Sequence, residues 1–203
     1  MLDATWGEDK PAPPDSAFRV HPPECAGSTT EEKLGAIREK MEERGAKAAV
    51  FAMLDEVAYV LNLRGADIEC CPVCISYLIV TSSGATLYCD ADKVASIDVI
   101  EHLREANVCV QPYESVLSDL RSIVDGDEEG KVWVDPTKAS HGIARVVPSV
   151  SVNESRHDEV GERQHNCILT LTPSMLVLGS SGGGSEPGGA DEGRQERGGG
   201  KSL

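Results

Sequence analysis

Short apolar runs alternate with segments of helical periodicity along the middle of the chain. The runs have the compact, β-branched or apolar composition of buried strands, and they cover residues 47–53, 75–81, 85–89, 108–110 and 131–134. Helical segments separate most of them, while a Ser-Ser-Gly turn joins the second run to the third as a β-hairpin. This alternation predicts an α/β domain with a mixed β-sheet flanked by helices.

The first helix carries clear start and stop signals. Ser28 followed by Glu31 fits a capping box, in which each side chain satisfies a free backbone N–H of the other residue. Gly45 stands where a left-handed residue would end the helix. One apolar stripe lies between these signals, formed by Leu34, Ile37 and Met41.

Two further helices are expected with less complete signals. Asp55 is expected to cap a helix over residues 56–62, and Gly65 is expected to end it. A helix over residues 97–107 is expected, with Ile100 and Leu103 on one face.

Proline and glycine mark the two ends of the chain. Residues 1–27 hold five of the eleven prolines, so we expect an extended, proline-rich linker that joins neither a helix nor a central strand. Residues 179–203 hold ten of the twenty glycines, a composition that indicates disorder. The globular domain is therefore expected over residues 28–147, with a divergent C-terminal tail over 148–203 that includes an apolar stretch at 168–178.

The charge balance excludes several partners. The 203-residue chain has 19 basic and 34 acidic residues, a net charge of −15, which argues against nucleic acids and anionic membranes. No apolar run reaches the roughly 20 residues that span a bilayer, and no secretory signal is visible. The seven cysteines, an odd count without such a signal, favour reduced thiols and a cytoplasmic location.

Cys71 and Cys74 form the sharpest local motif, a CxxC pair. Such a pair can bind zinc or act as a redox dithiol, or it can be two unremarkable thiols that pack as small hydrophobic groups. A closed zinc site needs four ligands, and the spacing of the other cysteines and of the five histidines suggests no second pair. We therefore expect no structural zinc at these weak candidates.

No other catalytic pattern emerges. The acidic loop at 125–130 lacks the ligand spacing of a calcium loop, and the glycines at 180–185 are followed by no lysine. The histidines form no HExxH motif, and no Ser/His/Asp set can be assembled.

Several motifs nevertheless occur in the order known from one family. Residues 54–67 (LDEVAYVLNLRGAD) resemble a signature of cytosolic Xaa-Pro aminopeptidases, which belong to the creatinase/prolidase superfamily. Pro72 and Val73, then Ser76 and Tyr77, are similar to the next part of that signature. The flanking matches are residues 6–11 (WGEDKP), 28–34 and 131–135 (KVWVD).

This resemblance implies a creatinase N-terminal-like domain. Complete family members have two such α/β domains before a catalytic domain, which holds manganese or another divalent metal pair and removes the first residue of X-Pro peptides. The resemblance runs from about Trp6 to Val147, so we expect the second, non-catalytic domain, truncated and inactive alone, with no cofactor in this chain. Cys71 and Cys74 stand where the family has Asn and Phe, which argues against a family-wide metal role for them.

The resemblance also suggests where a substrate would approach. In the superfamily the loop after the second helix points toward the catalytic cleft, which makes Asn62, Arg64 and Gly65 substrate-proximal candidates for proline-containing peptides. The plainer alternative is that Arg64 pairs with a carboxylate and that Gly65 only supplies a positive φ. Two other functions stay open: a module that pairs as a homodimer or with a full-length peptidase, and a thiol or zinc protein.

Overall fold

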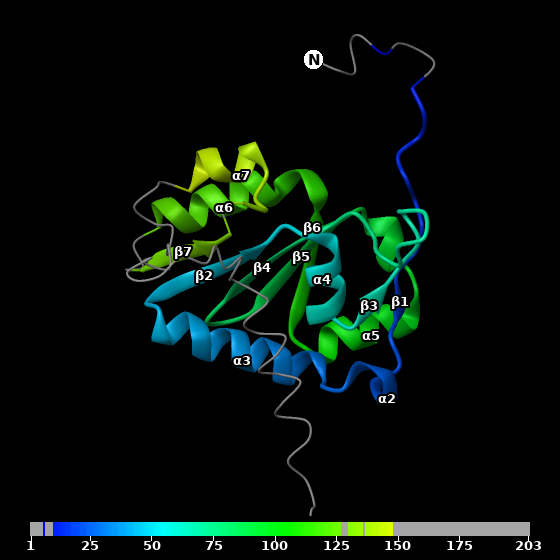
Figure 1. Ribbon diagram of the computed structural model, residues 1–203, viewed down its shortest axis with the longest axis horizontal. Helices are drawn as coiled ribbons and strands as arrows, with labels where there is room; N and C mark the ends of the chain where they lie inside the picture. The colour runs from blue at the N-terminus through cyan, green and yellow to red at the C-terminus, as the bar shows by residue number, and fades with distance from the viewer. Residues whose placement is uncertain (1–5, 7–9, 127–129, 136, 148–203) are drawn as a thin grey trace, which may run out of the picture.

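The computed structural model of the protein describes residues 6, 10–126, 130–135 and 137–147 (Figure 1). Half of the acidic loop, residues 127–129, lies outside the described residues. The expected tail over 148–203, with its apolar and glycine-rich stretches, also lies outside them.

A five-stranded mixed sheet forms the centre of the domain, with strand order β6-β5-β4-β2-β7. Three inner strands pair antiparallel, and the two edge strands add to them in parallel. The mixed sheet and the hairpin of the sequence analysis are therefore confirmed. The strands are β2 (Ala46–Phe51), β4 (Tyr77–Thr81), β5 (Ala85–Cys89), β6 (Val108–Pro112) and β7 (Lys131–Val134).

Helices cover both faces of the sheet, as predicted (Figure 1). One face carries α3 (Thr30–Glu43), α4 (Leu54–Val60) and α5 (Ile97–Glu105). The other face carries α6 (Val116–Asp125) and α7 (His141–Val146). Two short 3₁₀ turns, η2 (Ala91–Val94) and η3 (Tyr113–Ser115), precede α5 and α6.

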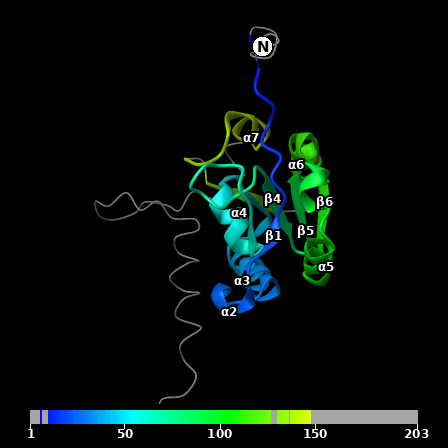
Figure 2. The same ribbon diagram turned by 90° about the vertical axis from the view of Figure 1, so that its right-hand side faces the viewer.

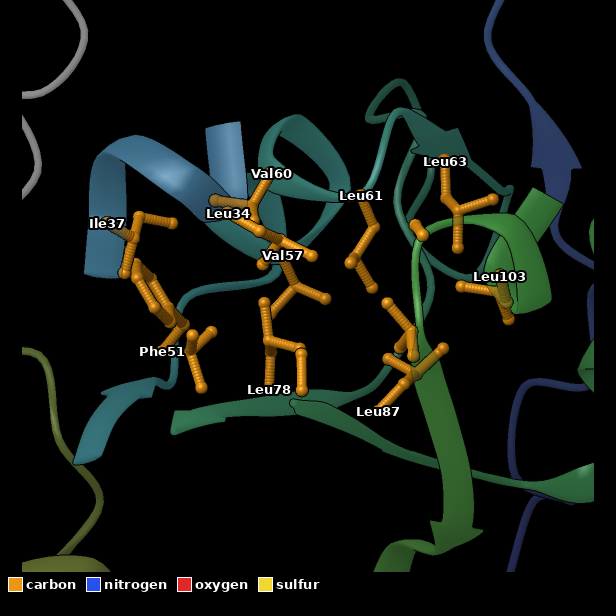
Figure 3. Packing of buried hydrophobic residues seen from close by; sticks show 14 of the residues in the cluster. Leu34, Ile37, Phe51, Val57, Val60, Leu61, Leu63, Leu78, Leu87 and Leu103 are labelled. Atoms are coloured by element: carbon orange, nitrogen blue, oxygen red, sulfur yellow. The ribbon is translucent and has the colours of Figure 1, made fainter. Parts of the chain in front are cut away.

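The inner strand β2, between β4 and β7, shows why both layers are needed. Ala49 and Phe51 point into the core under α3 and α4, while Ala48 and Val50 point into the core under α6 and α7. Successive strand residues face opposite sides of a sheet, so a strand that is apolar throughout must be covered twice. Figure 3 shows the larger core, where Leu34 and Ile37 of α3 meet Val57 of α4 above Leu78 and other sheet residues.

The start of α3 lies one residue later than expected. Thr29 is the N-cap, and its side chain and that of Glu32 form the capping box, instead of Ser28 and Glu31. The local sequence allows both registers. Tertiary contacts distinguish them, because the Ser28 carbonyl accepts a bond from Asn62, and the Thr30 hydroxyl lies 3.1 Å from Nε2 of His102. Gly45 has a φ of 60° just past the helix, as predicted.

The limits expected for α4 were wrong. Asp55 lies inside the helix and does not cap it, since Met53 is the N-cap without a side-chain bond. Asn62, with a φ of 51°, takes the left-handed conformation that was assigned to Gly65. Asparagine is one of the few residues that tolerate this conformation. The chain then runs directly into the short strand β3 (Leu63–Arg64).

Ile100 and Leu103, which were expected on one face of α5, differ in burial. Ile100 is 50% exposed, whereas Val99 and Leu103 are buried. Val99 and Leu103 are four residues apart and therefore lie on one helix face. Ile100 lies next to that face together with Ile97, which is 71% exposed.

The expectation that the proline-rich leader joins no helix was wrong. It contributes β1 (Arg19–Val20), which pairs antiparallel with β3, and the one-turn helix α2 (Pro23–Ala26). Pro23 opens α2, where a missing N–H costs nothing because the first turn has no partner for it. Figure 2 shows the blue segment that leads to β1 running down the side of the domain, and Phe18 is buried in the core.

Candidate functional site

The turn after α4, which holds the three expected site residues, is built around the buried side chain of Asn62. Its Nδ2 donates a hydrogen bond to the Ser28 carbonyl at 2.9 Å, and its Oδ1 accepts one from Lys33 Nζ at 2.6 Å. Both ends of the amide are thus satisfied inside the protein. These bonds hold the turn against the first residues of α3 and give Asn62 a positioning role.

Lys33 is an unusual residue for an interior, because its side chain is 1% exposed. Besides Asn62, its Nζ donates to the Tyr59 carbonyl at 2.9 Å and lies 3.9 Å from the centre of the Tyr59 ring. Within the described ranges no carboxylate forms an ion pair with it. Burial, with a smaller effect of nearby Arg64, lowers the pKa of Lys33 to about 8.

Arg64 is half-buried beside this turn. Its NH1 donates to the carbonyls of Ala58 at 2.9 Å and Leu63 at 2.8 Å. The carboxylate partner that the plainer alternative assigned to Arg64 is absent among the described residues. Burial, followed by the charge of Arg19, lowers the pKa of Arg64. The guanidinium is thus held in place without being neutralised.

Gly65 is required for space and not for a positive φ. Its φ is outside the left-handed range, so that part of the plainer alternative was wrong. A Cβ at this position would lie 2.0 Å from Sγ of Cys74 and 3.2 Å from its Cβ. Atoms that are not bonded cannot approach so closely, and only glycine lets the two segments pack.

A buried polar network next to this loop was missed by the sequence analysis. The Asp67 carboxylate pairs with Lys93 and accepts bonds from the hydroxyl of Ser16 at 2.9 Å and the N–H of Ile75 at 2.7 Å. Lys93 also donates to the Pro14 carbonyl at 2.9 Å. Burial alone would raise the pKa of Asp67, but its hydrogen bonds and Lys93 together hold that pKa below the usual value. Of the residues in this network, only Asp67 could have been picked out from the sequence, because it belongs to the 54–67 motif.

The cysteines of the CxxC motif lie in different environments. Cys71 is partly exposed in a tight turn, whereas Cys74 is buried with its Sγ 3.6 Å from the Ser16 hydroxyl. Burial raises the pKa of the Cys74 thiol, which keeps it protonated and unreactive at neutral pH. In the part of the chain that the structure describes, no three His, Cys, Asp or Glu side chains gather as a metal-binding group. The absence of zinc from this motif stays a prediction.

An open pocket of about 210 Å³ lies between the β1–α2 turn, the start of α3 and the end of α5. Asn62 is the one expected site residue that lines it, together with His21, Thr30 and His102. Nε2 of His102 lies 2.8 Å from the Leu61 carbonyl, so this ring also braces the turn after α4. Arg64 and Gly65 do not line this pocket.

The family model of the creatinase/prolidase N-terminal domain matches residues 9–166 of the chain. The chain belongs to this family. The match starts near Trp6 and extends past Val147, where the motif resemblance ends. As a creatinase/prolidase N-terminal domain, the chain has the mixed α/β fold that the resemblance implied.

Curated relatives connect this creatinase/prolidase domain with Xaa-Pro aminopeptidases. A probable Xaa-Pro aminopeptidase P of Neosartorya fischeri is 39% identical over 129 residues, which are 64% of this chain and 19% of the relative. A probable Xaa-Pro aminopeptidase P of Paracoccidioides lutzii is 42% identical over 123 residues, 61% of this chain and 20% of the relative. The chain thus spans about a fifth of the length of these relatives.

A solved structure supports the same relationship. It is the X-prolyl aminopeptidase from Caenorhabditis elegans, described as a cytosolic enzyme with a di-nuclear active site. Its chain superposes with a TM-score of 0.69 and 28% identity over 75% of this chain and 25% of its own. The side chains described for this creatinase/prolidase domain form no cluster that would fit such a metal pair. No helix among the described residues is long and apolar enough to cross a bilayer.

Proposed function

We propose that this chain is a non-catalytic domain of a cytoplasmic Xaa-Pro metalloaminopeptidase, inactive alone, which supports a separate metal-binding catalytic domain. The observation that carries this proposal is the superposition on one quarter of the C. elegans enzyme. The manganese or other divalent metal pair belongs, in this proposal, to the catalytic domain, and the present domain needs no cofactor of its own.

The chemistry of the acidic side chains supports the non-catalytic role. Metal-assisted hydrolysis of a peptide bond needs carboxylate and imidazole ligands that hold the metal and activate a water molecule. The most buried carboxylates among the described residues already form ion pairs with lysines. Asp67 pairs with Lys93, and Oε1 of Glu56 lies 2.7 Å from Nζ of Lys138.

In the complete enzyme we propose that the loop after α4 faces a proline-containing peptide. Arg64 is the group suited to contact it, since its guanidinium is partly exposed and is not neutralised by a described carboxylate. Asn62 and Gly65 act as positioning residues. Asn62 ties the loop to α3, and Gly65 allows its close packing on Cys74.

A second candidate function is an interaction module that pairs with itself or with a full-length peptidase. The observation that favours it is the apolar surface of α5, where Ile97 and Ile100 are 71% and 50% exposed. They lie three residues apart and so share one helix face. Large exposed apolar side chains on one face are common where proteins associate.

A peptidase assay tests the principal proposal. The purified chain, with and without added Mn²⁺, is expected to release no N-terminal residue from an Arg-Pro-Pro peptide, because its described residues form no ligand cluster for a metal pair. The control contains the metal and peptide without protein. Release above that control would contradict a non-catalytic role.

The interaction module is tested by sedimentation over a range of concentrations. If α5 forms the interface, an Ile97→Asp/Ile100→Asp variant will stay monomeric where the wild type forms dimers. An Ile68→Asp variant serves as the matched control, since Ile68 is 42% exposed in the loop after β3 and outside that interface. A wild type that is monomeric at all concentrations would remove the self-pairing form of this candidate.

A further inference from the structure

Two arginines stand directly opposite each other in the small β1–β3 ribbon. The register pairs Arg19 with Arg64 and Val20 with Leu63. Leu63 is fully buried in the core. Since neighbouring side chains of a strand point to opposite faces, Arg19 and Arg64 share the face that points away from that core.

This face is electrostatically unbalanced. Like charges that lie opposite each other on paired strands destabilise the pairing, and the charge of Arg19 adds to the effect of burial in lowering the pKa of Arg64. Lys33, buried nearby, adds a third positive charge. In the described parts of the chain, none of these three groups forms an ion pair with a carboxylate, although the whole chain has a net charge of −15.

Arg64 is also oriented in advance. Its NH1 is fixed by two backbone carbonyls, at 2.9 and 2.8 Å. Its remaining N–H groups make no hydrogen bond to a described residue, and the same holds for the whole guanidinium of exposed Arg19. A guanidinium whose other edge is free matches the two oxygens of a carboxylate or phosphate group.

We propose that Arg19 and Arg64 form an oxyanion-binding site on the β1–β3 ribbon. The site takes a single carboxylate or phosphate group, which neutralises the facing arginines. A long polyanion fits it poorly, because Glu31 and Glu105 line the adjacent pocket. The inference goes beyond the proposed function, since it needs neither a catalytic domain nor a peptide substrate.

The test is an NMR titration of the full chain with inorganic phosphate and, separately, with succinate, at constant ionic strength. We expect saturable shifts of the backbone amides of residues 19–21 and 62–65 with at least one of these probes. Tighter binding of phosphate would identify a phosphate source, and tighter binding of succinate a carboxylate source. Shifts that rise linearly without saturation, or no shifts with either probe, would overturn the proposal.

Variants make the test specific. Arg19→Gln and Arg64→Gln are expected to weaken binding at least tenfold, whereas Arg121→Gln is expected to bind as the wild type. Arg121 is an exposed arginine on α6, across the sheet from the ribbon. Equal binding by Arg19→Gln and the wild type would contradict the site.

Thermal unfolding provides a second readout. Arg19 is exposed and its guanidinium makes no hydrogen bond to a described residue, so Arg19→Gln can be assessed even if Arg64→Gln fails to fold. Without a bound anion, Arg19→Gln is expected to melt higher than the wild type, because it removes the repulsion. The saturating anion is expected to raise the melting temperature of the wild type alone. A lower melting temperature for Arg19→Gln than for the wild type without anion, or an anion effect on Arg19→Gln alone, would contradict repulsion between Arg19 and Arg64.

Discussion

Individual side chains of this domain show how burial changes the chemical properties of a residue. Lys33 lies in the interior with carbonyl oxygens and an aromatic ring as partners. Hydrogen bonds stabilise such a lysine, but its burial still disfavours the charged form of the amine. The stability of the domain should therefore depend on the protonation of this one group.

Lys33 predicts a stability that rises with pH. Its pKa is about 8 in the folded protein, against the ordinary value of 10.5 in the unfolded chain. Between these two values the unfolded state binds more protons, so the free energy of unfolding increases with pH. Urea unfolding at pH 7, 8 and 9 should show that the wild type gains stability relative to Lys33→Met. A difference between the two proteins that is constant over this range would contradict the prediction.

Gly65 predicts a steric effect. Gly65→Ala places a methyl group against Sγ of Cys74, and we expect a loss of about 1–3 kcal/mol of stability, typical of overpacking. Gly35→Ala is the matched control, since nothing lies within 4 Å of its Cβ in the middle of α3. That control should stabilise the domain by roughly 0.5–1 kcal/mol.

A double variant identifies the cause of the Gly65 effect. If the clash with the sulfur dominates, Gly65→Ala should cost less in a Cys74→Ala background than in the wild type. Chemical denaturation of the four proteins measures this coupling. Additive losses would show that the sulfur is not the limiting contact.

At the scale of elements, the segment before α3 is part of the domain and not only a connection to it. β1 pairs with β3, and the Asp67 network attaches Ser16 and Pro14 to the loop after β3 and to η2. A two-residue strand has few backbone bonds of its own. The buried ion pair and Phe18 therefore carry much of the attachment.

Asp67→Asn tests this attachment. The substitution leaves Lys93 buried without its counter-charge, and removal of one partner of a buried pair costs about 3–5 kcal/mol. We expect this loss of stability together with faster proteolysis of residues 10–18. Asp98→Asn, at an exposed position in α5, should leave both properties unchanged.

The Asp67 carboxylate also makes the stability of the domain depend on pH. The pKa of Asp67 in the folded protein is held below its usual value. The contribution of Asp67 to the free energy of unfolding is therefore complete at a pH above the usual pKa, and it is lost as the pH falls through the pKa of the folded state. Acid titration of the wild type and Asp67→Asn should therefore show the two stabilities converging at low pH. A gap that persists in acid would contradict a charge-based role.

For the whole molecule, the structure changes where a stable fragment should begin. The domain expected over residues 28–147 omits Phe18 and β1, which the structure places against the core and against β3. We predict that a fragment of residues 10–147 melts several degrees above a fragment of residues 28–147. A loss of a few kcal/mol of buried contact corresponds to a shift of that size or more in a domain of this length. Equal melting temperatures would restore the boundary at residue 28.

The amino-acid sequence alone determined the fold class of this protein. The alternation of apolar runs and helical periodicity, the hairpin turn and the motif order all act over short distances along the chain. Gly45 is the clearest case, because a helix end with a left-handed residue is a local event. The motifs of the 54–67 segment likewise led to the family without any knowledge of contacts.

Only the tertiary structure decided the details of the candidate site. The choice of Thr29 over Ser28 as the cap of α3 depends on contacts with the distant Asn62 and His102. The need for glycine at position 65 depends on Cys74, and the meeting of Arg19 with Arg64 depends on the pairing of β1 with β3. The residues of such a pair are far apart in the sequence and meet only when the chain closes long loops around a common core. The local conformational preference of either residue therefore does not predict the contact.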